Sequence, residues 1–537
     1  MRFLPVNLDA VLVELDDLSQ TLALLASLQA EPIAGVDDIV PAARTLLVTF
    51  RPVAVSLAEL IERIGVRRLD AHVEAMGERI EIPVTYNGED LEEVAGLLGI
   101  SPQEVVRRHT GSDYTVAFTG FAPGFAYLSG GDASLNVPRR ATPRTRIPAG
   151  AVGLAGSFSG VYPQASPGGW QIIGVTATRM WDLSRDRPAL LQPGQRVRFV
   201  DAGPQTSAST APAVPQMATM EPLLAPSMGG SALEVRQSGL QALFQDLGRH
   251  GQAGQGVSTS GAMDRASLRA ANRLVGNRSD AVCVEAVYGG LQLVCRGDAV
   301  VAVAGAQGPL ELLARNGSRW PVPRHAPIAL SDGDALLIGE PSAGIRSYVA
   351  VRGGFAFAPV LGSCATDTLA NIGPRPLAAG DVLPIRPPAP GAVVGLPESA
   401  PADLPMLDEV VTLDVVMGPR TDWFAPESLE LLATQIWTVT PQSNRVGVRL
   451  SGEQPLARTA AMQGAELPSE GTALGALQVP PNGQPVLFMA DHPLTGGYPV
   501  IASVASYDID RAGQLPIGAR VRLCPISPDF ARQLLTP

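Results

Sequence analysis

The stretch TGFAPGFAYLSGGD at residues 119–132, with VPRRATPRTRIPAG at 137–150 and VYPQASPGGWQIIG at 161–174, is the most informative part of this chain. Glycines and prolines recur in it at the density of rigid turns rather than of a packed core. It also places four arginines within residues 139–146. A loop of this composition predicts backbone N–H and guanidinium groups that face an anionic ligand.

The rest of the chain predicts a modular globular protein. Its 537 residues exceed what one hydrophobic core organises, so several domains are expected. The sequence has no apolar run long enough to span a membrane, and the first nine residues do not resemble a signal peptide, so we expect a cytoplasmic protein without membrane partners. Reduced, buried thiols without metal spacing are expected at Cys283, Cys295, Cys364 and Cys524.

The sequence contains no lysine, so all 40 basic residues are arginine. This excludes a biotin-accepting lysine, a phosphate-loop lysine and a Schiff-base lysine. A bound anion must therefore be held by arginine or by backbone amides. The formal net charge of −11 argues against nucleic acid as a partner, because binding to phosphates requires a surplus of basic surface.

Hydrophobic periodicity predicts a small α/β unit at the start of the chain. Strands are expected at residues 10–15 and 44–50, and helices at 18–28 and 57–64. Beyond this unit, short strands alternate with Gly/Pro turns, which is typical of barrels or sandwiches. The predicted fold class is therefore mainly β with α/β portions.

Two further helices have recognisable ends. Ser101 with Pro102 and Glu104 forms a capping box that predicts a helix ending near His109, before a strand at 114–119. A second helix is expected at 263–275, with Ser260 before it and Gly276 and Asn277 closing it.

A weak repeat supports a division into modules. LLQPGQRVRFV from Leu190, LAAGDVLPI from Leu377 and LPIGARVRLCP from Leu515 each combine a turn with an alternating strand that could close a β-rich module. The expected parts are an α/β domain at 1–78, a β module at 79–202, a Pro/Ala/Ser-rich linker at 203–230 and two β modules at 231–395 and 396–537.

In the first half, His109 is a candidate proton carrier, and a helix-end cap is the equal alternative. Arg144 and Arg146 would share one face of a strand and could clamp a carboxylate or phosphate, unless they simply line a solvated edge. A turn whose amides face a ligand is predicted at Gln164, Ser166, Gly168, Gly169 and Trp170. The alternative for Trp170 is packing in the core.

In the second half, polar groups gather at two places. One candidate set of anion-binding residues surrounds the helix start near Ser260, whose alternative role is a simple cap; it comprises Gln245, Asp246, Arg249, Ser260, Asp264, Asn272 and Glu285. The other set comprises Glu470, Gln478, Gly496, Gly497 and Tyr498, beside Asp491 and His492 as a candidate catalytic carboxylate and imidazole. No metal-binding motif is present.

These blocks resemble a known family. GFAPGFAYL, VPRRATPRTRIPAG and VYPQASPGGWQIIG resemble the B-type subunit of 5-oxoprolinase, also called allophanate hydrolase subunit 1 or KipI. VRQSGLQALFQDLGRHG, SGAMDRASLRAANRLVGN, SNRVGVRLSG, SEGTALGALQVPPNGQP and TGGYP resemble the C-type subunit, allophanate hydrolase subunit 2 or KipA. The resemblance covers nearly the whole chain and identifies it as a fusion of the two subunits.

The resemblance implies tandem cyclophilin-like barrels and a role in ATP-dependent opening of 5-oxo-L-proline to L-glutamate. It implies ATP with Mg²⁺ as cofactor and a separate A-type 5-oxoprolinase subunit as partner, with a homo-oligomer as one option. An alternative is a carboxyltransferase component acting on urea or a related amide, as in urea carboxylase, with biotin supplied by a separate carrier protein. A third is KipI/KipA-like regulation of a histidine kinase.

The chain departs from the family pattern at one point. Where relatives tend to have DHQTTGGYP, this chain has DHPLTGGYP, so Pro493 and Leu494 replace two polar residues. If these side chains touch the substrate, the specificity should differ.

Overall fold

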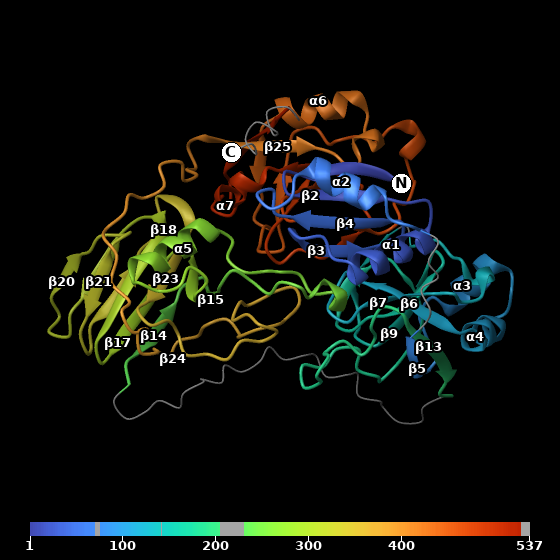
Figure 1. Ribbon diagram of the computed structural model, residues 1–537, viewed down its shortest axis with the longest axis horizontal. Coiled ribbons are helices and arrows are strands. Elements are labelled where there is room, and N and C mark those ends of the chain that lie inside the picture. The colour runs from blue at the N-terminus through green and yellow to red at the C-terminus, as the bar shows by residue number, and fades with distance from the viewer. Residues whose placement is uncertain (70–75, 141, 204–229, 528–537) are drawn as a thin grey trace.

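The structure of the chain is a computed structural model that describes residues 1–69, 76–140, 142–203 and 230–527. The predicted linker lies outside the described residues except at its two ends. The chain is mainly β, with a small α/β part at its N-terminus and barrel-like groups of strands after it (Figure 1). The predicted fold class is confirmed at this level, while the domain boundaries stay predictions.

The N-terminal part is a four-stranded antiparallel sheet with two helices. Its strands follow the order β1-β2-β4-β3. The strands and helices are β1 (Arg2–Asn7), β2 (Ala10–Glu14), α1 (Leu18–Ala30), β3 (Val36–Pro41), β4 (Thr45–Phe50) and α2 (Leu57–Gly65). Asp17 caps α1 and Ser56 caps α2, each by accepting a backbone N–H of the first turn. The four elements predicted here are confirmed.

A seven-stranded sheet follows, in the order β12-β9-β10-β7-β6-β13-β5, beside a two-stranded ribbon of β8 and β11. Its last strand, β13, returns parallel to its first, β5. The elements are β5 (Met76–Val84), α3 (Leu91–Leu98), α4 (Pro102–Gly111), β6 (Tyr114–Thr119), β7 (Ala126–Ser129), β8 (Arg144–Ile147), β9 (Ala151–Ala155), β10 (Phe158–Val161), β11 (Ser166–Gly168), β12 (Gln171–Val175) and β13 (Gln195–Asp201).

The predicted start of α4 is confirmed, but the capping box is only half formed. The Ser101 hydroxyl accepts the Glu104 backbone N–H at 3.2 Å. The Glu104 carboxylate does not reach back to Ser101; it accepts hydrogen bonds from Arg107 and Arg108 at 2.6–2.7 Å. A nearby pair of cations is a stronger partner for a carboxylate than one backbone amide.

The next part consists of two sheets, ordered β20-β19-β22-β17-β14-β24 and β15-β16-β23-β18-β21, with helix α5 packed against β18 and β23. Its elements are β14 (Ala232–Ser238), β15 (Gln241–Gln245), α5 (Arg265–Leu274), β16 (Cys283–Val287), β17 (Leu291–Arg296), β18 (Ala299–Gln307), β19 (Leu310–Leu313), β20 (Arg319–Pro321), β21 (Pro327–Leu330), β22 (Ala335–Ile338), β23 (Ala343–Val351) and β24 (Val382–Pro384).

The last part is a closed barrel in the order β25-β32-β29-β30-β27-β26-β33, with a separate pair of β28 and β31. Its elements are β25 (Val410–Met417), α6 (Pro426–Thr434), β26 (Trp437–Val439), β27 (Gly447–Ser451), β28 (Glu470–Gly471), β29 (Ala476–Gln478), β30 (Val486–Phe488), β31 (Thr495–Gly496), β32 (Val500–Val504), α7 (Ile509–Ala512) and β33 (Arg520–Pro525).

The sequence repeat corresponds to a structural one. Its three copies form β13, β24 and β33, and each of these strands pairs with the first strand of its own part, β5, β14 or β25. Each copy is therefore a strand that pairs back to the start of its part, and in the C-terminal part this pairing belongs to a closed barrel. The closing role of the first two copies stays a prediction.

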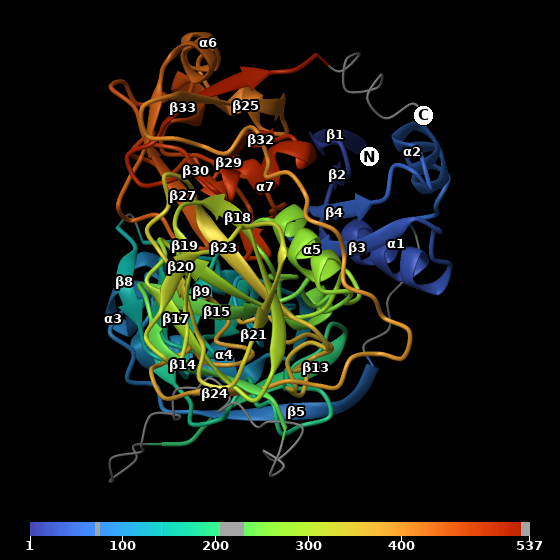
Figure 2. The same cartoon turned by 90° about the vertical axis from the view of Figure 1, so that its left-hand side faces the viewer.

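The N-terminal part packs on the C-terminal barrel, although the two are at opposite ends of the chain (Figures 1 and 2). The Asn7 side chain donates to the Val504 carbonyl at 2.9 Å. Arg420 of the barrel binds Glu14 at 2.8 Å and also pairs with Glu470. Glu14 also pairs with Arg2 at 3.0 Å. A largely buried ion cluster thus joins the two ends of the fold.

Two sequence expectations can be checked directly. In the described part of the chain, no helix has the length and apolarity needed to cross a membrane. All four cysteines are free, and three are buried, but Cys524 is exposed because it lies on an outward-facing position of β33. The expectation of buried thiols is therefore wrong for Cys524.

Replacing Arg420 should destabilise the contact between the two ends. Arg420→Met leaves Glu470 without its cation and Glu14 with only the more exposed Arg2, and breaking a buried pair in this way costs about 3–5 kcal/mol. Urea denaturation should show a loss of this size in the free energy of unfolding. Arg278→Met, which removes an exposed pair with Asp280, should cost less than about 1 kcal/mol. Equal losses in both variants would contradict a role for the buried cluster.

Candidate functional site

A cavity of about 860 Å³ lies between the seven-stranded module and the C-terminal barrel. Residues from both halves of the chain line it. The first half supplies Phe121, Phe125, Tyr127, Arg139, Arg140, Pro143, Tyr162 and 167–170; the second half supplies 455–458, 463–466, Ser469, 478–483, Pro493 and 495–498. The segment 119–174 is therefore one side of a composite pocket, which we call the interdomain pocket.

Aromatic rings form one wall of the interdomain pocket. Trp170 meets Phe125 edge-on with ring centroids 5.2 Å apart and Tyr127 at 5.5 Å. These rings and Tyr162 are almost fully buried in their own cluster while their edges line the cavity. Trp170 thus fulfils both predicted alternatives, packing in a core and bordering the pocket. Such a wall suits the apolar face of a small ligand.

Three arginines reach the interdomain pocket, and they differ in their partners. Arg140 donates to Asp90 at 2.6 Å and Glu93 at 2.9 Å, so its charge is neutralised. Arg139 donates to the Ser469 hydroxyl at 3.1 Å, and Arg458 donates to a backbone carbonyl. Among the described residues, neither Arg139 nor Arg458 pairs with a carboxylate.

The predicted clamp of Arg144 and Arg146 is wrong as a substrate site. Arg144 binds both oxygens of the buried Asp90, at 2.8 and 2.6 Å. Its charge is therefore used to hold the start of α3 against β8. Arg146 is exposed and does not line the interdomain pocket. A carboxylate clamp does exist, but its carboxylate belongs to the protein.

Two glycines leave space for polar side chains in the pocket wall, because a larger residue at either position would collide with them. A Cβ atom on Gly497 would collide with the Arg139 guanidinium, and one on Gly496 would lie 2.5 Å from the Gln478 amide nitrogen. Gln478 in turn donates to the Tyr498 carbonyl at 3.2 Å. Four of the predicted ligand-binding residues, Gln478, Gly496, Gly497 and Tyr498, are therefore in the pocket wall.

The turn at residues 164–170 is divided between two tasks. Gly168, Gly169 and Trp170 line the interdomain pocket. Gln164 lies behind it, donates to the Leu369 carbonyl at 2.9 Å and accepts from Asn371 at 3.1 Å. Ser166 begins β11, which pairs with β8. Gln164 and Ser166 therefore hold the turn in place rather than contact a ligand.

His109 does not have the surroundings of a proton carrier. Its side chain is fully buried, its Nδ1 lies 2.6 Å from the Tyr86 hydroxyl and its Nε2 lies 2.8 Å from the Ser159 hydroxyl. Burial lowers the pKa of His109 to about 3. The catalytic prediction is wrong, because both ring nitrogens are engaged inside the core and the ring does not reach the interdomain pocket.

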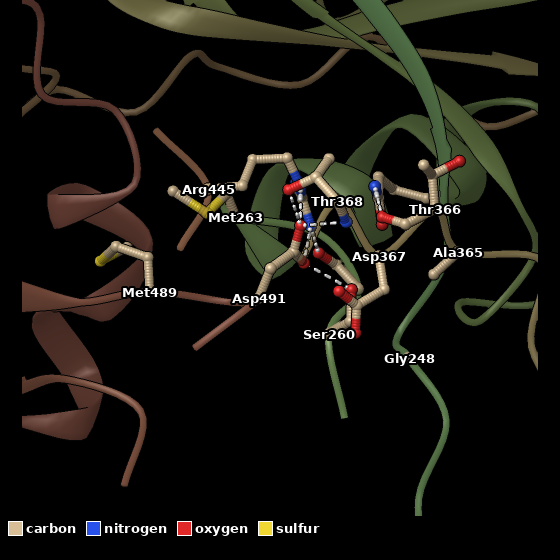
Figure 3. Close-up of polar contacts among 12 residues, drawn as sticks. Gly248, Ser260, Met263, Ala365, Thr366, Asp367, Thr368, Arg445, Met489 and Asp491 are labelled. Atoms are coloured by element: carbon tan, nitrogen blue, oxygen red, sulfur yellow. Dashed lines mark hydrogen bonds and ion pairs between the residues drawn. The ribbon is translucent and has the colours of Figure 1, made fainter. Parts of the chain in front are cut away.

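Asp491 belongs to a second polar centre, between the two-sheet part and the barrel (Figure 3). It accepts hydrogen bonds from Ser260 at 2.6 Å, from Thr368 at 2.7 and 2.9 Å and from Arg445 at 2.9 and 3.0 Å. Arg445 also donates to Glu285 at 2.6 Å. We call Arg445, Glu285 and Asp491 the buried charge cluster.

The buried charge cluster is saturated and closed to solvent. Burial alone would raise the pKa of Asp491, but Arg445 and the hydroxyl and amide donors lower it. Burial would lower the pKa of Arg445, but Asp491 and Glu285 raise it. Asp491 and Glu285 are therefore structural anions rather than a catalytic base or ligand contacts, which corrects both predictions.

The other residues predicted around this helix start also have internal partners. The N-cap of α5 is Asp264, which accepts from Ser267, so the proposed cap at Ser260 is wrong. The free N–H groups of Arg265 and Ala266 are taken by Asp510 at 2.8 and 3.0 Å, which leaves no anion site there. Gln245, Asp246, Arg249 and Asn272 bind backbone or side-chain groups of neighbouring loops and strands.

Three residues around the TGGY segment also differ from the predictions. His492 is buried and faces the Met489 and Thr472 carbonyls at 2.8 and 3.2 Å, so it is not catalytic. Glu470 pairs with Arg420 and does not line the interdomain pocket. Leu494 packs in a core between the barrel and the N-terminal sheet, whereas Pro493 lines the interdomain pocket. Only Pro493 of the two unusual residues can affect a ligand directly.

Of the two residues that best fit an anion, Arg139 belongs to the arginine-rich segment predicted to face one but was not singled out within it, and Arg458 was not predicted. Arg139 lies in the arginine-rich segment beside the more regular pair at 144 and 146, and Arg458 carries no motif signal. The only sequence signal for Arg139 was the position of the VPRR motif, just before Arg144 and Arg146. Which arginine is neutralised depends on Asp90, about fifty positions earlier, and local sequence does not show this.

Comparison with known proteins identifies the chain as a member of the carboxyltransferase domain family. Residues 1–191 match the family described as carboxyltransferase domain, subdomain C and D, and residues 255–525 match subdomain A and B. The chain belongs to this family. Within it, the chain is homologous to the B-type and C-type subunits of 5-oxoprolinase, which are fused here in one polypeptide.

The relatives differ in how much of them the chain covers. It is 35% identical to the C-type 5-oxoprolinase subunit of Escherichia coli, over 55% of this chain and 91% of that protein. It is 38% identical to the B-type subunit of Bacillus subtilis, over 33% of this chain and 80% of that protein. It is 35% identical to urea amidolyase of Lachancea kluyveri, over 56% of this chain but only 17% of that enzyme.

A solved structure matches along nearly the whole chain. The crystal structure of TTHA0988 superimposes with a TM-score of 0.82 at 34% identity, covering 96% of this chain and 99% of that one. The order of the parts and their packing are therefore shared with a known structure.

The pH dependence of stability should report on Asp367, which lies beside the buried charge cluster. Burial and the nearby Asp491 raise the pKa of Asp367 to about 7, from about 3.9 in an unfolded chain. The folded chain keeps a proton that the unfolded chain releases, so the free energy of unfolding should fall as the pH rises from about 4 to 7.

Asp367→Asn should flatten this fall, because asparagine cannot ionise and its oxygen can still accept from the Leu369 and Ala370 amides. Urea denaturation at several pH values measures the slope. The matched control is Asp186→Asn, at an exposed aspartate. This variant should keep the slope of the unsubstituted chain. An unchanged slope in Asp367→Asn would contradict the assignment.

Proposed function

We propose that this chain is the fused B/C component of an ATP-dependent 5-oxoprolinase, which opens 5-oxo-L-proline to L-glutamate together with a separate A-type subunit. In this reaction water adds across the lactam C–N bond: the hydroxyl goes to the carbonyl carbon and the proton to the nitrogen. Homology to the B-type and C-type subunits supports this proposal. The single observation that carries it is the interdomain pocket, with Arg139 free of a carboxylate partner among the described residues.

Each part of the pocket would have a defined task. The substrate carboxylate would accept hydrogen bonds from Arg139, whose planar guanidinium matches a carboxylate. The apolar edge of the five-membered ring would pack against Trp170 and Tyr162. Gln478 and the backbone of Gly496 and Gly497 would orient the lactam group.

ATP with Mg²⁺ is part of the proposal as the cofactor of the complex between this chain and the A-type subunit. Within the residues that the structure describes, no group of three or more His, Cys, Asp and Glu could hold a metal ion, and Glu466 is the one carboxylate lining the pocket. Mg²⁺ in nucleotide sites is held by one or two carboxylates together with the phosphates, so we keep ATP with Mg²⁺ in the proposal as the cofactor of the complex with the A-type subunit. The cytoplasmic location and the cyclophilin-like character of the barrels stay predictions.

A second candidate is a carboxyltransferase component that acts on urea or a related amide. The family and the urea amidolyase relatives favour it. Because the chain has no lysine, biotin would have to arrive on a separate carrier protein. Regulation of a histidine kinase is a third possibility on the same fold, and binding to a kinase domain with altered autophosphorylation would support it.

Release of glutamate distinguishes the candidates. The purified chain, 5-oxo-L-proline and ATP should yield glutamate only when an A-type subunit is added. A parallel reaction with urea, bicarbonate, ATP and a biotinylated carrier with its carboxylase should yield no carboxylated urea. Carboxylation without glutamate would favour the second candidate and contradict the first.

Arg139→Met should lower kcat/KM for 5-oxo-L-proline by at least tenfold in this assay, because a hydrogen bond to a charged group contributes about 1.5–3 kcal/mol. Arg146→Met, which removes an exposed arginine of the same segment outside the pocket, should leave turnover unchanged. If Arg139→Met kept full activity, the carboxylate would bind elsewhere.

Gly497→Ala tests the same site without removing a charge. The added methyl group would displace the Arg139 guanidinium, so KM for 5-oxo-L-proline should rise severalfold with the fold intact. Gly111→Ala adds a methyl group where no atom lies within 4 Å and should leave KM unchanged. Equal KM values in the two variants would show that the position of Arg139 does not matter.

A further inference from the structure

The interdomain pocket contains two arginines without a carboxylate partner among the described residues, one from each half of the chain. Arg139 comes from the loop after η1 (Ala133–Leu135) in the seven-stranded module, and Arg458 comes from the barrel. The described residues provide no carboxylate partner for either. The third arginine, Arg140, is neutralised by Asp90 and Glu93. The pocket therefore carries two positive charges that the protein does not pair.

The two guanidinium groups lie in different local surroundings. Arg139 is next to Gly497 and Ser469. Arg458 lies over the face of Trp423, 5.5 Å from the ring centroid, and donates to the Ala465 carbonyl at 3.1 Å. They are thus held by separate contacts, so each is a distinct point of attachment.

The segment Gly497–Tyr498 lines the same cavity as both arginines. A Cβ atom on Gly497 would collide with the Arg139 guanidinium, so this arginine lies against the segment. Arg139 and Arg458 are therefore two separate points of attachment in the lining of one pocket.

The cavity is larger than one small amide requires. Its volume of about 860 Å³ lies near the upper end of the range of about 300–1,000 Å³ that accommodates drug-sized ligands. A five-membered lactam would fill only part of it. The remaining volume is open to a second ligand beside the first.

We infer that the interdomain pocket binds two anionic groups at once, a carboxylate on Arg139 and a small oxyanion of the phosphate or bicarbonate type on Arg458. The inference rests on the proposed function for the identity of the first group. The second site would hold the oxyanion that an activating step leaves or supplies next to the amide. Neither guanidinium has a carboxylate partner among the described residues, and a bound anion would supply one for each.

The test uses binding to the purified full chain alone, without its proposed partner. Isothermal titration should show one site for 5-oxo-L-proline and one site for inorganic phosphate or bicarbonate, each still present when the other is saturated. The two oxyanions, titrated separately and in competition, establish which of them the second site prefers. Arg139→Met should weaken 5-oxo-L-proline about tenfold or more and leave the oxyanion unchanged; Arg458→Met should do the reverse.

Two further variants sharpen the test. Glu466 belongs to the segment 463–466 of the barrel, which lines the pocket. Glu466→Gln should strengthen oxyanion binding, because it removes a negative charge that repels the anion. Arg146→Met is the matched control and should change neither affinity.

The outcomes separate the inference from the proposed function. Absence of oxyanion binding to the unsubstituted chain, competition between the two ligands for one site, or equal losses of both ligands in each arginine variant would overturn it. If two sites are found but no glutamate forms with the A-type partner, the proposed function fails while the two-anion pocket stands. If glutamate forms but no oxyanion binds, the proposed function stands and the two-anion pocket fails.

Discussion

The pocket depends on one buried interaction, the contact of Arg445 with Glu285 and Asp491. Arg445 comes from the barrel, whereas Glu285 lies on β16 of the two-sheet part, so the three charges fasten two modules together. An unpaired charge buried between the two modules would cost much free energy. The three side chains therefore stay paired, and this fixes the position of one module relative to the other. Asp491 lies two residues before Pro493, the first residue of the last segment that lines the pocket. The orientation of this wall therefore follows from the cluster.

A second contact reaches the same wall from the other end of the chain. The N-terminal sheet packs on the barrel, and the Ala43 backbone N–H donates to the Ser469 carbonyl at 3.1 Å. The Ser469 hydroxyl in turn accepts from Arg139. Three segments far apart in the sequence thus meet at one arginine, which explains why both halves of the chain are needed for one site.

Prediction from the sequence was most successful where local chemistry decides the structure. The capped start of α4 at Ser101 and the strand-forming repeats follow from residues within a few positions, and both are confirmed. The pocket-lining glycines at 168–169 and 496–497 were also predicted, and at Gly168, Gly496 and Gly497 a Cβ atom would collide with a neighbouring side chain.

Prediction was least successful where distant residues decide the role of a charge. Arg144 and Arg139 look alike in sequence, but Asp90 neutralises only the former. His109 becomes an inert core residue because Tyr86, Phe199 and Ser159 surround it. Asp491 and His492 had the right chemistry for catalysis, yet the fold turns both into buried structural groups. Burial and pairing are properties of the packed modules, which local patterns do not encode.

The central claim is that Arg139 holds the substrate carboxylate in a pocket made by both halves of the chain. A crystal structure of the full chain with 5-oxo-L-proline tests it most directly. The ligand should lie between Trp170 and Gly497, with its carboxylate hydrogen-bonded to the Arg139 guanidinium. A ligand bound outside this pocket, or one whose carboxylate contacts Arg144 or the cluster around Arg445 instead, would contradict it.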